Sequence, residues 1–575
     1  MYKPTLDPKA EFNNKWTIGD LLLPCAVIAL IFTIVQTARE FTGKFDSHYA
    51  IDLSLSNLPT YTVQTLLRMV MAYILSLVFT MVYAYTAYRS RLWAMVLIPL
   101  LDILQSIPVL SFLPAVVLAL VTLFPGQRLG VELASILLIF TGMTWNMTFS
   151  FYSSLMNIPK ELIEATRTYR LNAWQAFWTL ELPSGAVGLV WNSVMSVAGG
   201  WFFLMATESF TLSEKDFTLP GLGSFLKAAA DKGDTLSITV GILVLISIIT
   251  TIDYFIWRPL IAWAEKFKFE TVEATEIPES RVLDFLRRSP TLRIASERIF
   301  APLWEAFERG FVPSRPPLPK PEHTAPWVRW MNWLFLSGFG LIVVWGTWQA
   351  VLLLATLPLE DWQKVLQGAV FTSLRVLVVL IISLLITVPV GVIIGRNPKL
   401  AQFLQPLVQI AASVPATALF PVLLLFLANV GGGLDIGAVI LMTLGSMWYV
   451  LFNVIAGAQS IPSELFEAAR VYKLSLVQRW RTLILPGIFP YLITGIITAV
   501  GGAWNASIAG EYIKFQGKVL TATGLGQTIT QASDAGKYPL LLAATVVMSF
   551  LVVATNRLVW RPLYRLAQQK YQILV

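Results

Sequence analysis

Apolar residues recur along this chain in runs of roughly 20, separated by short polar segments. A helix of that length crosses a ~30 Å hydrocarbon core at 1.5 Å per residue. The short alternating segments of a membrane β-barrel are not visible. The pattern therefore predicts an all-α integral membrane protein with about twelve transmembrane helices. The expected spans are residues 17–38, 62–88, 94–123 with a break at Pro108, 130–156, 184–207, 236–257, 330–355, 368–395, 400–427, 434–457, 487–510 and 539–560.

The second half of this pattern repeats the first. The sequence of Pro159–Ala165 returns in Pro462–Ala468, and the offset of 303 residues continues without a gap to the end of the expected spans. Upstream of the fourth span the offset is 307. Internal repeats define an architecture before any other feature does. We predict two tandem six-helix units, half one at 1–263 and half two at 329–575, which form a pseudo-dimer within one chain.

A polar linker at 264–328 joins the two halves. Its first part, Ser280–Phe307, has some helical periodicity, and its end carries five prolines between Pro313 and Pro321. A proline-rich segment of this kind forms a semi-rigid extended spacer. The linker fits either a simple tether or an element that binds a partner or regulates the protein.

Composition and charge agree with a membrane protein. Hydrophobic residues make up 56% of the chain and charged residues 13%, against about 25% charged in an average soluble protein. The net charge of +8 does not require nucleic acid as a partner, because membrane proteins concentrate Lys and Arg in cytoplasmic loops. The distribution of these basic residues predicts that both termini are cytoplasmic and that membrane lipid surrounds the spans.

The polar loop between the fourth and fifth expected spans is the most informative segment. It reads EATRTYRL from Glu164 and EAARVYKL from Glu467, and a proline follows each glutamate by 19 residues, at Pro183 and Pro486. Acidic residues lie in its first turn and basic residues in its last, which suits the dipole of a short amphipathic helix. The proline is expected to begin the next span, where its missing N–H has no cost.

This loop resembles the EAA loop of permease subunits from type I ATP-binding-cassette importers, in which Glu-Ala-Ala is followed by a glycine and then by Ile-x-Leu-Pro. The surrounding sequence is similar to the nitrate, sulfonate, taurine and bicarbonate branch of that family. The resemblance implies a bacterial-type inner (plasma) membrane, two ABC ATPase subunits and an external solute-binding protein as partners. It also implies that the loops couple to the ATPases through Glu164, Ala165, Tyr169, Arg170, Glu467, Ala468, Ala469, Tyr472 and Lys473.

The loops depart from the family pattern at one position. The family glycine is Arg170 in half one and Lys473 in half two. A residue with a long side chain enters the left-handed conformation less readily than glycine. We expect either that the loop helix continues past this point or that the basic charge faces an acidic patch on the ATPase.

The sequence shows no motif for ATP hydrolysis or for binding a metal ion. No Gly-x-x-x-x-Gly-Lys-Ser/Thr motif occurs, so the chain has no phosphate-binding loop of that type. We expect no enzyme activity and no bound cofactor in this chain, with ATP and Mg²⁺ held by the partner subunits. The two histidines and the single cysteine, Cys25, provide no His/Cys metal cluster.

Charged residues inside the expected spans are functional candidates, because they are costly in a membrane. Arg68 and Glu208 in half one correspond to Arg375 and Glu511 in half two. All four are expected near the outer ends of their spans. We hypothesise that each arginine pairs with the glutamate of its own half close to an outer gate; alternatively, each charge separately faces lipid headgroups or caps backbone.

The halves differ after a repeated tryptophan, Trp201 or Trp504, which we also expect in the pathway. Half one continues with FFLM, whereas half two continues with Asn505-Ala-Ser507-Ile. A polar wall facing an apolar wall suits an asymmetric pathway for a small molecule, so we place polar contacts to substrate at Asn505 and Ser507. Helix packing by small residues is the alternative. The proline kinks at Pro108 and Pro415 free backbone carbonyls that could line the same pathway.

The sequence thus predicts a permease for a small polar solute, and the family branch suggests an inorganic or small organic anion. Two other functions remain compatible with the residues. A secondary transporter driven by ions also uses internal repeats. A membrane scaffold or receptor could recruit soluble partners through the two loops.

Overall fold

The computed structural model describes residues 50–570, except for 106, 213–214, 268–279, 289–297, 299–300, 304–325, 421–422, 425–432 and 516–517. The first expected span and the proline-rich end of the linker lie outside the described residues. Within the linker, α12 (Arg281–Arg288) forms where the periodicity predicted a helix.

Nine helices within the described ranges are long and apolar enough to cross a membrane. They are Leu55–Arg89, Arg128–Met156, Ala173–Phe203, Thr235–Ala264, Trp333–Ala355, Leu359–Arg396, Gly433–Gln459, Leu476–Gly510 and Tyr538–Ala567. Two shorter apolar helices lie at Arg91–Leu101 and Leu113–Leu123. The all-α membrane fold is confirmed, while the full number of twelve spans is not established by the described part of the chain.

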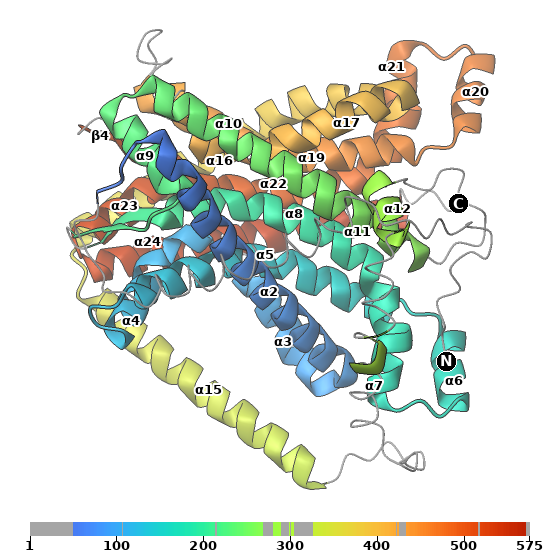
Figure 1. Ribbon diagram of the computed structural model, residues 1–575, viewed down its shortest axis with the longest axis horizontal. Coiled ribbons are helices and arrows are strands. Elements are labelled where there is room, and N and C mark those ends of the chain that lie inside the picture. The colour runs from blue at the N-terminus through green and yellow to red at the C-terminus, as the bar shows by residue number, and fades with distance from the viewer. Residues whose placement is uncertain are drawn as a thin grey trace.

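Each half packs its long helices in the same order. The helices of half one are α2 (Leu58–Arg89), α5 (Arg128–Met156), α8 (Leu182–Glu208) and α10 (Thr235–Ile252). Their counterparts in half two are α16 (Leu359–Arg396), α19 (Gly433–Gln459), α22 (Leu485–Gly510) and α24 (Tyr538–Thr555). In both halves the second helix of the set packs between the first and the third. Helix α15 (Pro326–Ala355) precedes this set in half two and extends along the edge of the molecule (Figure 1).

The third expected span of half one is broken, as its proline predicted. It consists of α3 (Arg91–Leu104), the 3₁₀ turn η2 (Val109–Ser111) and α4 (Leu113–Leu123). Pro108 has an extended backbone and precedes η2. In half two, α17 (Pro398–Ser413) ends just before Val414 and Pro415. Proline at these positions excludes a continuous helix, because it lacks the N–H and clashes with the preceding turn.

The fifth and sixth spans each contain a π-helical turn, at Phe177–Glu181, Asp253–Trp257, Trp480–Ile484 and Asn556–Trp560. In all four a proline stands two residues after the turn. The wider turn accommodates a proline that would otherwise disrupt the hydrogen-bond ladder. The expectation that Pro183 begins its span was therefore wrong: α7 (Ala173–Ala176), the π turn and α8 form one continuous helix that starts at Ala173.

Two short antiparallel hairpins lie at one end of the molecule, and the sequence patterns did not predict them. Strand β1 (Ser209–Leu212) pairs with β2 (Lys215–Thr218), and β3 (Tyr512–Phe515) pairs with β4 (Lys518–Thr521). Each hairpin is followed by a short helix, α9 (Leu222–Lys232) or α23 (Leu525–Asp534). The loop helices α6 (Lys160–Thr168) and α20 (Ser463–Val471) both lie at the opposite end and are separated from each other (Figure 1).

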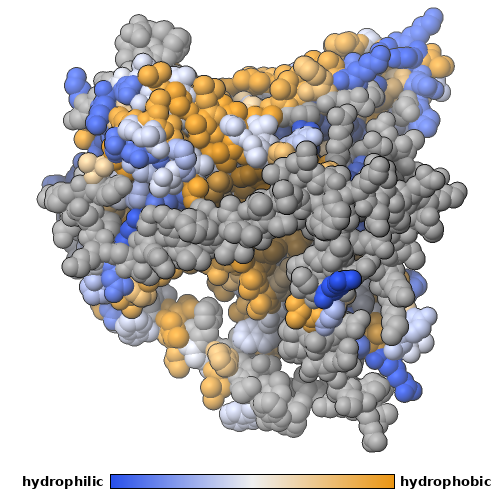
Figure 2. All heavy atoms as spheres, in the orientation of Figure 1, coloured by the Kyte–Doolittle hydropathy of each residue, from blue (hydrophilic) through white to orange (hydrophobic). Residues whose placement is uncertain are grey.

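The remaining described helices are short. They are η1 (Leu55–Asn57), α11 (Arg258–Ala264), η5 (Glu265–Phe267), α21 (Leu476–Arg479) and α25 (Arg561–Lys570). On the face shown in Figure 2, apolar side chains gather over α10 and α17 between the two ends, and polar side chains gather at the ends. Exposed apolar residues such as Leu236 and Leu243 on α10 are 67% and 60% exposed. An apolar belt between polar ends is what a bilayer requires of a protein surface.

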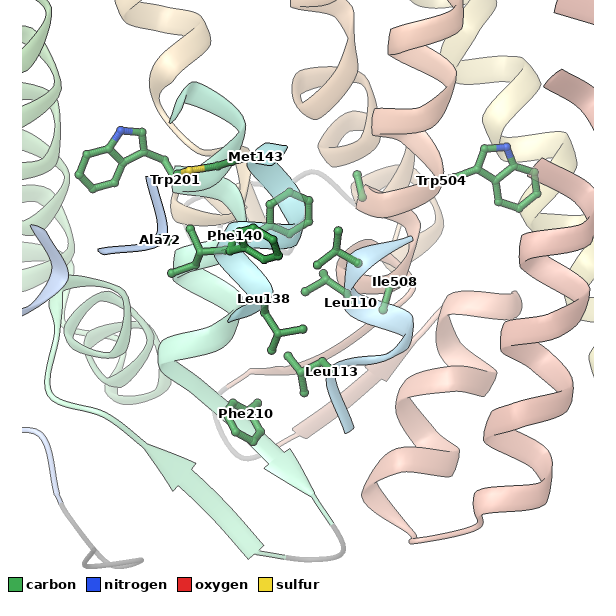
Figure 3. Close-up of a cluster of buried hydrophobic side chains, with 14 of the residues drawn as sticks. Ala72, Leu110, Leu113, Leu138, Phe140, Met143, Trp201, Phe210, Trp504 and Ile508 are labelled. Atoms are coloured by element: carbon green, nitrogen blue, oxygen red, sulfur yellow. The ribbon is translucent and has the colours of Figure 1, made fainter. Parts of the chain in front are cut away.

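The buried core runs across the boundary between the halves. It includes Leu110 and Leu113 of half one together with Ile508 of half two. Figure 3 shows these residues close together where η2 and α4 approach α22. This core cluster therefore contains buried residues from both halves.

Candidate functional site

A buried cluster of charges lies at the hairpin end of half one. The guanidinium of Arg68 on α2 contacts two carboxylates: its Nε lies 2.5 Å from Glu132 Oε2, and its Nη1 lies 2.7 Å from Glu208 Oε1. Arg128 lies 2.8 Å from the other oxygen of Glu132. The side chains of Arg68, Glu132 and Glu208 are completely buried. Two cations and two anions balance one another, which is the condition under which buried charges are tolerated.

The carboxylate of Glu208 also organises the backbone beyond the hairpin. It accepts hydrogen bonds from the Thr65 hydroxyl at 2.6 Å and from the Gly223 N–H at 2.6 Å, in the first turn of α9. An acceptor at this place satisfies a free N–H and suits the positive end of the helix dipole. A Cβ atom on Gly221 would lie 2.4 Å from the Glu208 carboxyl carbon, so only glycine permits this approach.

Half two repeats the arrangement with one difference. Arg375 contacts Glu511 at 2.8 Å and Asp435 at 2.6 Å, and Thr372 donates to Glu511 at 2.8 Å. The Gly526 N–H donates to Glu511 as its counterpart does in half one. The side chain of Asp435, however, is 73% exposed, whereas its counterpart Glu132 is completely buried.

The hypothesis that each arginine pairs with the glutamate of its own half is confirmed by these contacts. The sequence reasoning missed the second carboxylate of each cluster, Glu132 and Asp435. These two acidic residues are separated by 303 residues, which is the offset of the repeat. The change of offset between the halves falls just upstream and obscured their correspondence.

A cavity of ≈ 260 Å³ lies between the two halves. The broken third spans line it through Gln105, Ile107, Val109, Val414 and Pro415. The expectation that these kinks could border a pathway thus agrees with their position. One wall carries Phe202 and Phe203 of half one, and the facing wall carries Gly501, Gly502 and Asn505 of half two.

The two polar residues assigned to the wall of half two have different surroundings. Asn505 lines the cavity, and its Oδ1 accepts a hydrogen bond of 2.7 Å from the Val109 N–H of half one. Ser507 does not line it: the side chain is fully buried, and its hydroxyl donates to the Trp504 carbonyl of its own helix. Helical geometry explains the difference, because positions two apart face different sides of a helix.

The repeated tryptophans are packing residues in this structure. Trp201 and Trp504 are 2% and 3% exposed, and neither borders the cavity. Figure 3 shows their indole rings directed outward on opposite sides of the core. They pack within the helix bundle and do not line this cavity, so their expected place in the pathway stays a prediction.

A second cavity of ≈ 250 Å³ lies toward the hairpin end. It borders Leu110, Leu113 and Ile508, and residues of both hairpins such as Phe210 and Tyr512 contribute to it. Val109, which lines the first cavity, precedes Leu110 directly, so η2 contributes to both. The apolar contact of η2 with α22 therefore lies between the two cavities (Figure 3).

The loop helices α6 and α20 both end in the left-handed conformation at the position of the family glycine. Arg170 has φ 53° and Lys473 has φ 51°. In each loop the next amide donates to the carbonyl five residues back, as Leu171 does to Thr166 and Leu474 does to Ala469. These bonds define a Schellman motif, which normally carries glycine at this position.

The expectation that the helix continues past Arg170 and Lys473 was therefore wrong. The backbone hydrogen bonds terminate both helices at Arg170 and Lys473. The left-handed conformation of these two residues costs about 1–2 kcal/mol each, because their Cβ atoms crowd the backbone. The glutamates Glu164 and Glu467 are exposed on the loop helices. Tyr169 and Tyr472 directly precede the left-handed residues and are each 79% exposed. An aromatic residue left in solvent at the same place in both halves favours a protein contact.

Ala165 is partly buried, whereas Ala468 is exposed and Ala469 is 4% exposed. The two loop surfaces are therefore similar without being identical.

Within the described ranges, no group of three or more His, Cys, Asp or Glu side chains could hold a metal ion.

Comparison with known proteins matches both halves to one family, described as the binding-protein-dependent transport system inner membrane component. The matched residues are 76–257 and 387–561. The nitrate import permease protein NrtB of Synechococcus elongatus is 31% identical over 147 residues, which cover 26% of this chain and 49% of that protein. The bicarbonate transport system permease protein CmpB of the same organism is 30% identical over 133 residues, covering 23% of this chain and 46% of that protein.

A third relative, the taurine transport system permease protein TauC of Escherichia coli, is 25% identical over 229 residues. These residues cover 37% of this chain and 80% of that protein. For the nitrate and bicarbonate permeases the match spans only about half of the relative's length. The two family matches together extend over more than half of the present chain. This chain therefore belongs to the binding-protein-dependent transport system inner membrane component family and carries two copies of its conserved region in tandem.

Proposed function

We propose that the chain is the permease of an ATP-binding-cassette importer and forms the pathway for a small polar solute across an inner membrane. Both termini face the cytoplasm. An external solute-binding protein delivers the solute at the hairpin end, and two separate ABC ATPase subunits bind at the end that carries α6 and α20. ATP and Mg²⁺ are held by those subunits.

The duplicated loop helices are the observation that carries this proposal. Two short helices of the same sequence pattern protrude at one end of the molecule, each with an exposed glutamate and an exposed tyrosine. Each is followed by a short loop and then by a long helix that borders the cavity. That long helix begins with the capped first turn α7 or α21. A displacement of α6 or α20 by a partner would therefore be transmitted along a continuous helix to the cavity wall.

We propose a small inorganic or organic anion as the solute. The names of the relatives above, nitrate, bicarbonate and taurine permeases, support this class. The cavity walls agree with weak binding of an anion: none of the described lining residues is Asp, Glu, Lys, Arg or His. A fixed cation 4 Å from an anion would hold it by about 4 kcal/mol at an effective dielectric constant of 20, which slows its release.

Reversing the charge on both loop helices tests the ATPase contact. With Glu164→Arg and Glu467→Arg combined, we expect co-purification of the ATPase subunits with the chain to fall at least tenfold, and ATP-dependent uptake with it. The matched control is Glu360→Arg, the same chemical change on an exposed residue at the start of α16. The control should leave both measurements within twofold of the unmodified protein.

The same co-purification, together with uptake measured with and without ATP and with and without an ion gradient, separates the alternatives. Unchanged ATPase binding in the doubly reversed variant would overturn the coupling role of α6 and α20. Uptake that continues without ATP but needs an ion gradient would instead indicate a secondary transporter. Binding of soluble partners without any uptake would indicate a scaffold or receptor.

A further inference from the structure

Tyr449 lines the cavity and breaks the symmetry of the two halves. It lies on α19 and corresponds to Asn146 of half one; both residues line the cavity. A Cβ atom on Gly502 of α22 would lie 3.2 Å from the Tyr449 ring, and one on Gly199 of α8 would lie 3.6 Å from the Tyr449 hydroxyl. The side chain therefore reaches from half two across to the facing helix of half one.

The hydroxyl of Tyr449 has no hydrogen-bond partner among the described residues. Other tyrosine hydroxyls do have one: Tyr83 donates to the Leu97 carbonyl at 2.7 Å, and Tyr512 donates to the Asp534 carboxylate at 2.8 Å. A polar group that faces a cavity without a protein partner is available to a bound molecule.

One further hydrogen-bond donor borders the cavity from the same half. Asn505 uses its Oδ1 to accept from Val109 and one Nδ2–H to donate to Gly501, so its second N–H stays available. Its counterpart in half one is the apolar Phe202.

These donors match the chemistry of an oxyanion, whose oxygens accept hydrogen bonds in every direction. A cation would need carboxylates or free carbonyl groups, and the described lining contains no carboxylate. Resting on the proposed function, we infer that Tyr449 and Asn505 form a neutral donor site for a small oxyanion in half two, in which the Tyr449 hydroxyl determines specificity. The anion is held in transit by hydrogen bonds alone, so it can both enter and leave.

The test uses the full chain, assembled with its ATPase subunits and binding protein in lipid vesicles, and measures uptake of labelled nitrate, bicarbonate and taurine separately. Tyr449→Phe removes only the hydroxyl and keeps the ring against Gly502. It should lower the maximal uptake rate about tenfold, the loss expected for one hydrogen bond to a charged group. It should also change the ratio of rates between anions.

The matched control is Tyr491→Phe, which makes the same change where the ring packs on Gly457 away from the cavity. It should leave every rate within twofold. If the Tyr449→Phe chain does not accumulate in the membrane, Asn505→Asp replaces it, because it removes the N–H donors and keeps the oxygen that accepts from the Val109 N–H.

Rates and selectivity within twofold of the unmodified protein in these cavity variants would overturn the donor site and leave the importer function standing. If the unmodified protein takes up none of the three anions, the proposed anion substrate fails instead, and the site fails with it.

Discussion

The two buried charge clusters occupy the same place in the repeat but differ in their solvent exposure. In half one, Arg68 is enclosed by Glu132 and Glu208, all fully buried, with Arg128 completing the balance. In half two, Arg375 is 10% exposed, and one of its two carboxylates, that of Asp435, is largely in solvent. The first cluster is therefore closed to solvent and mainly stabilises the fold. In the second, water can replace the contact between Arg375 and Asp435 at a small cost in free energy.

The largest expected effect comes from removing the arginines. Arg68→Met leaves two carboxylates buried with only Arg128 to balance them, which costs about 3–5 kcal/mol of stability. Arg375→Met should cost about half as much, because Asp435 can be solvated where it lies. Thermal unfolding of the purified chain in one detergent gives the order of the two variants.

Arg91→Met is the control for this comparison, since Arg91 is an exposed arginine at the start of α3. It should change the unfolding midpoint little, as surface substitutions usually do. Equal destabilisation by Arg68→Met and Arg375→Met would refute the distinction between a closed and an open cluster.

A smaller effect is expected at the cavity, where the halves contact each other. Asn505→Ala leaves the Val109 N–H without its acceptor, at a cost of about 1–3 kcal/mol. Ser507→Ala should cost less than about 0.5 kcal/mol, because that hydroxyl only adds a bond within its own helix. Denaturation of the two variants in the same detergent compares them, and a Ser507→Ala effect as large as that of Asn505→Ala would argue against a bond between the halves.

The smallest effect concerns the ends of the loop helices, where the halves are most alike. Arg170→Gly and Lys473→Gly each remove the strain of a positive φ and should stabilise their loop by about 1 kcal/mol. Slower hydrogen exchange of the amides in α6 and in α20 would show this gain. Faster exchange in either loop would mean that the basic side chain stabilises the helix end by a contact that outweighs the strain.

The paired charges could be predicted because each lies at an equivalent position in both halves, and a charge inside an apolar span restricts the possible explanations. The burial of Ser507 and the two tryptophans away from the cavity could not be predicted from the same repeat. A pattern along the chain shows that Asn505 and Ser507 are polar, but it does not show which face of α22 meets half one. The left-handed ends at Arg170 and Lys473 were missed because side-chain preference opposes them.

The sequence by itself determined the membrane class, the internal repeat, the position of the loop helices and the equivalent positions of the charged residues in the two halves. These properties depend on local periodicity and on residues that recur at constant spacing. Only the tertiary structure decided that the charges pair and which carboxylates complete each cluster. It also decided that Asn505 bonds to half one and that the Tyr449 side chain lines the cavity with no hydrogen-bond partner among the described residues. Such properties depend on which helix faces meet, and packing across the whole molecule sets them.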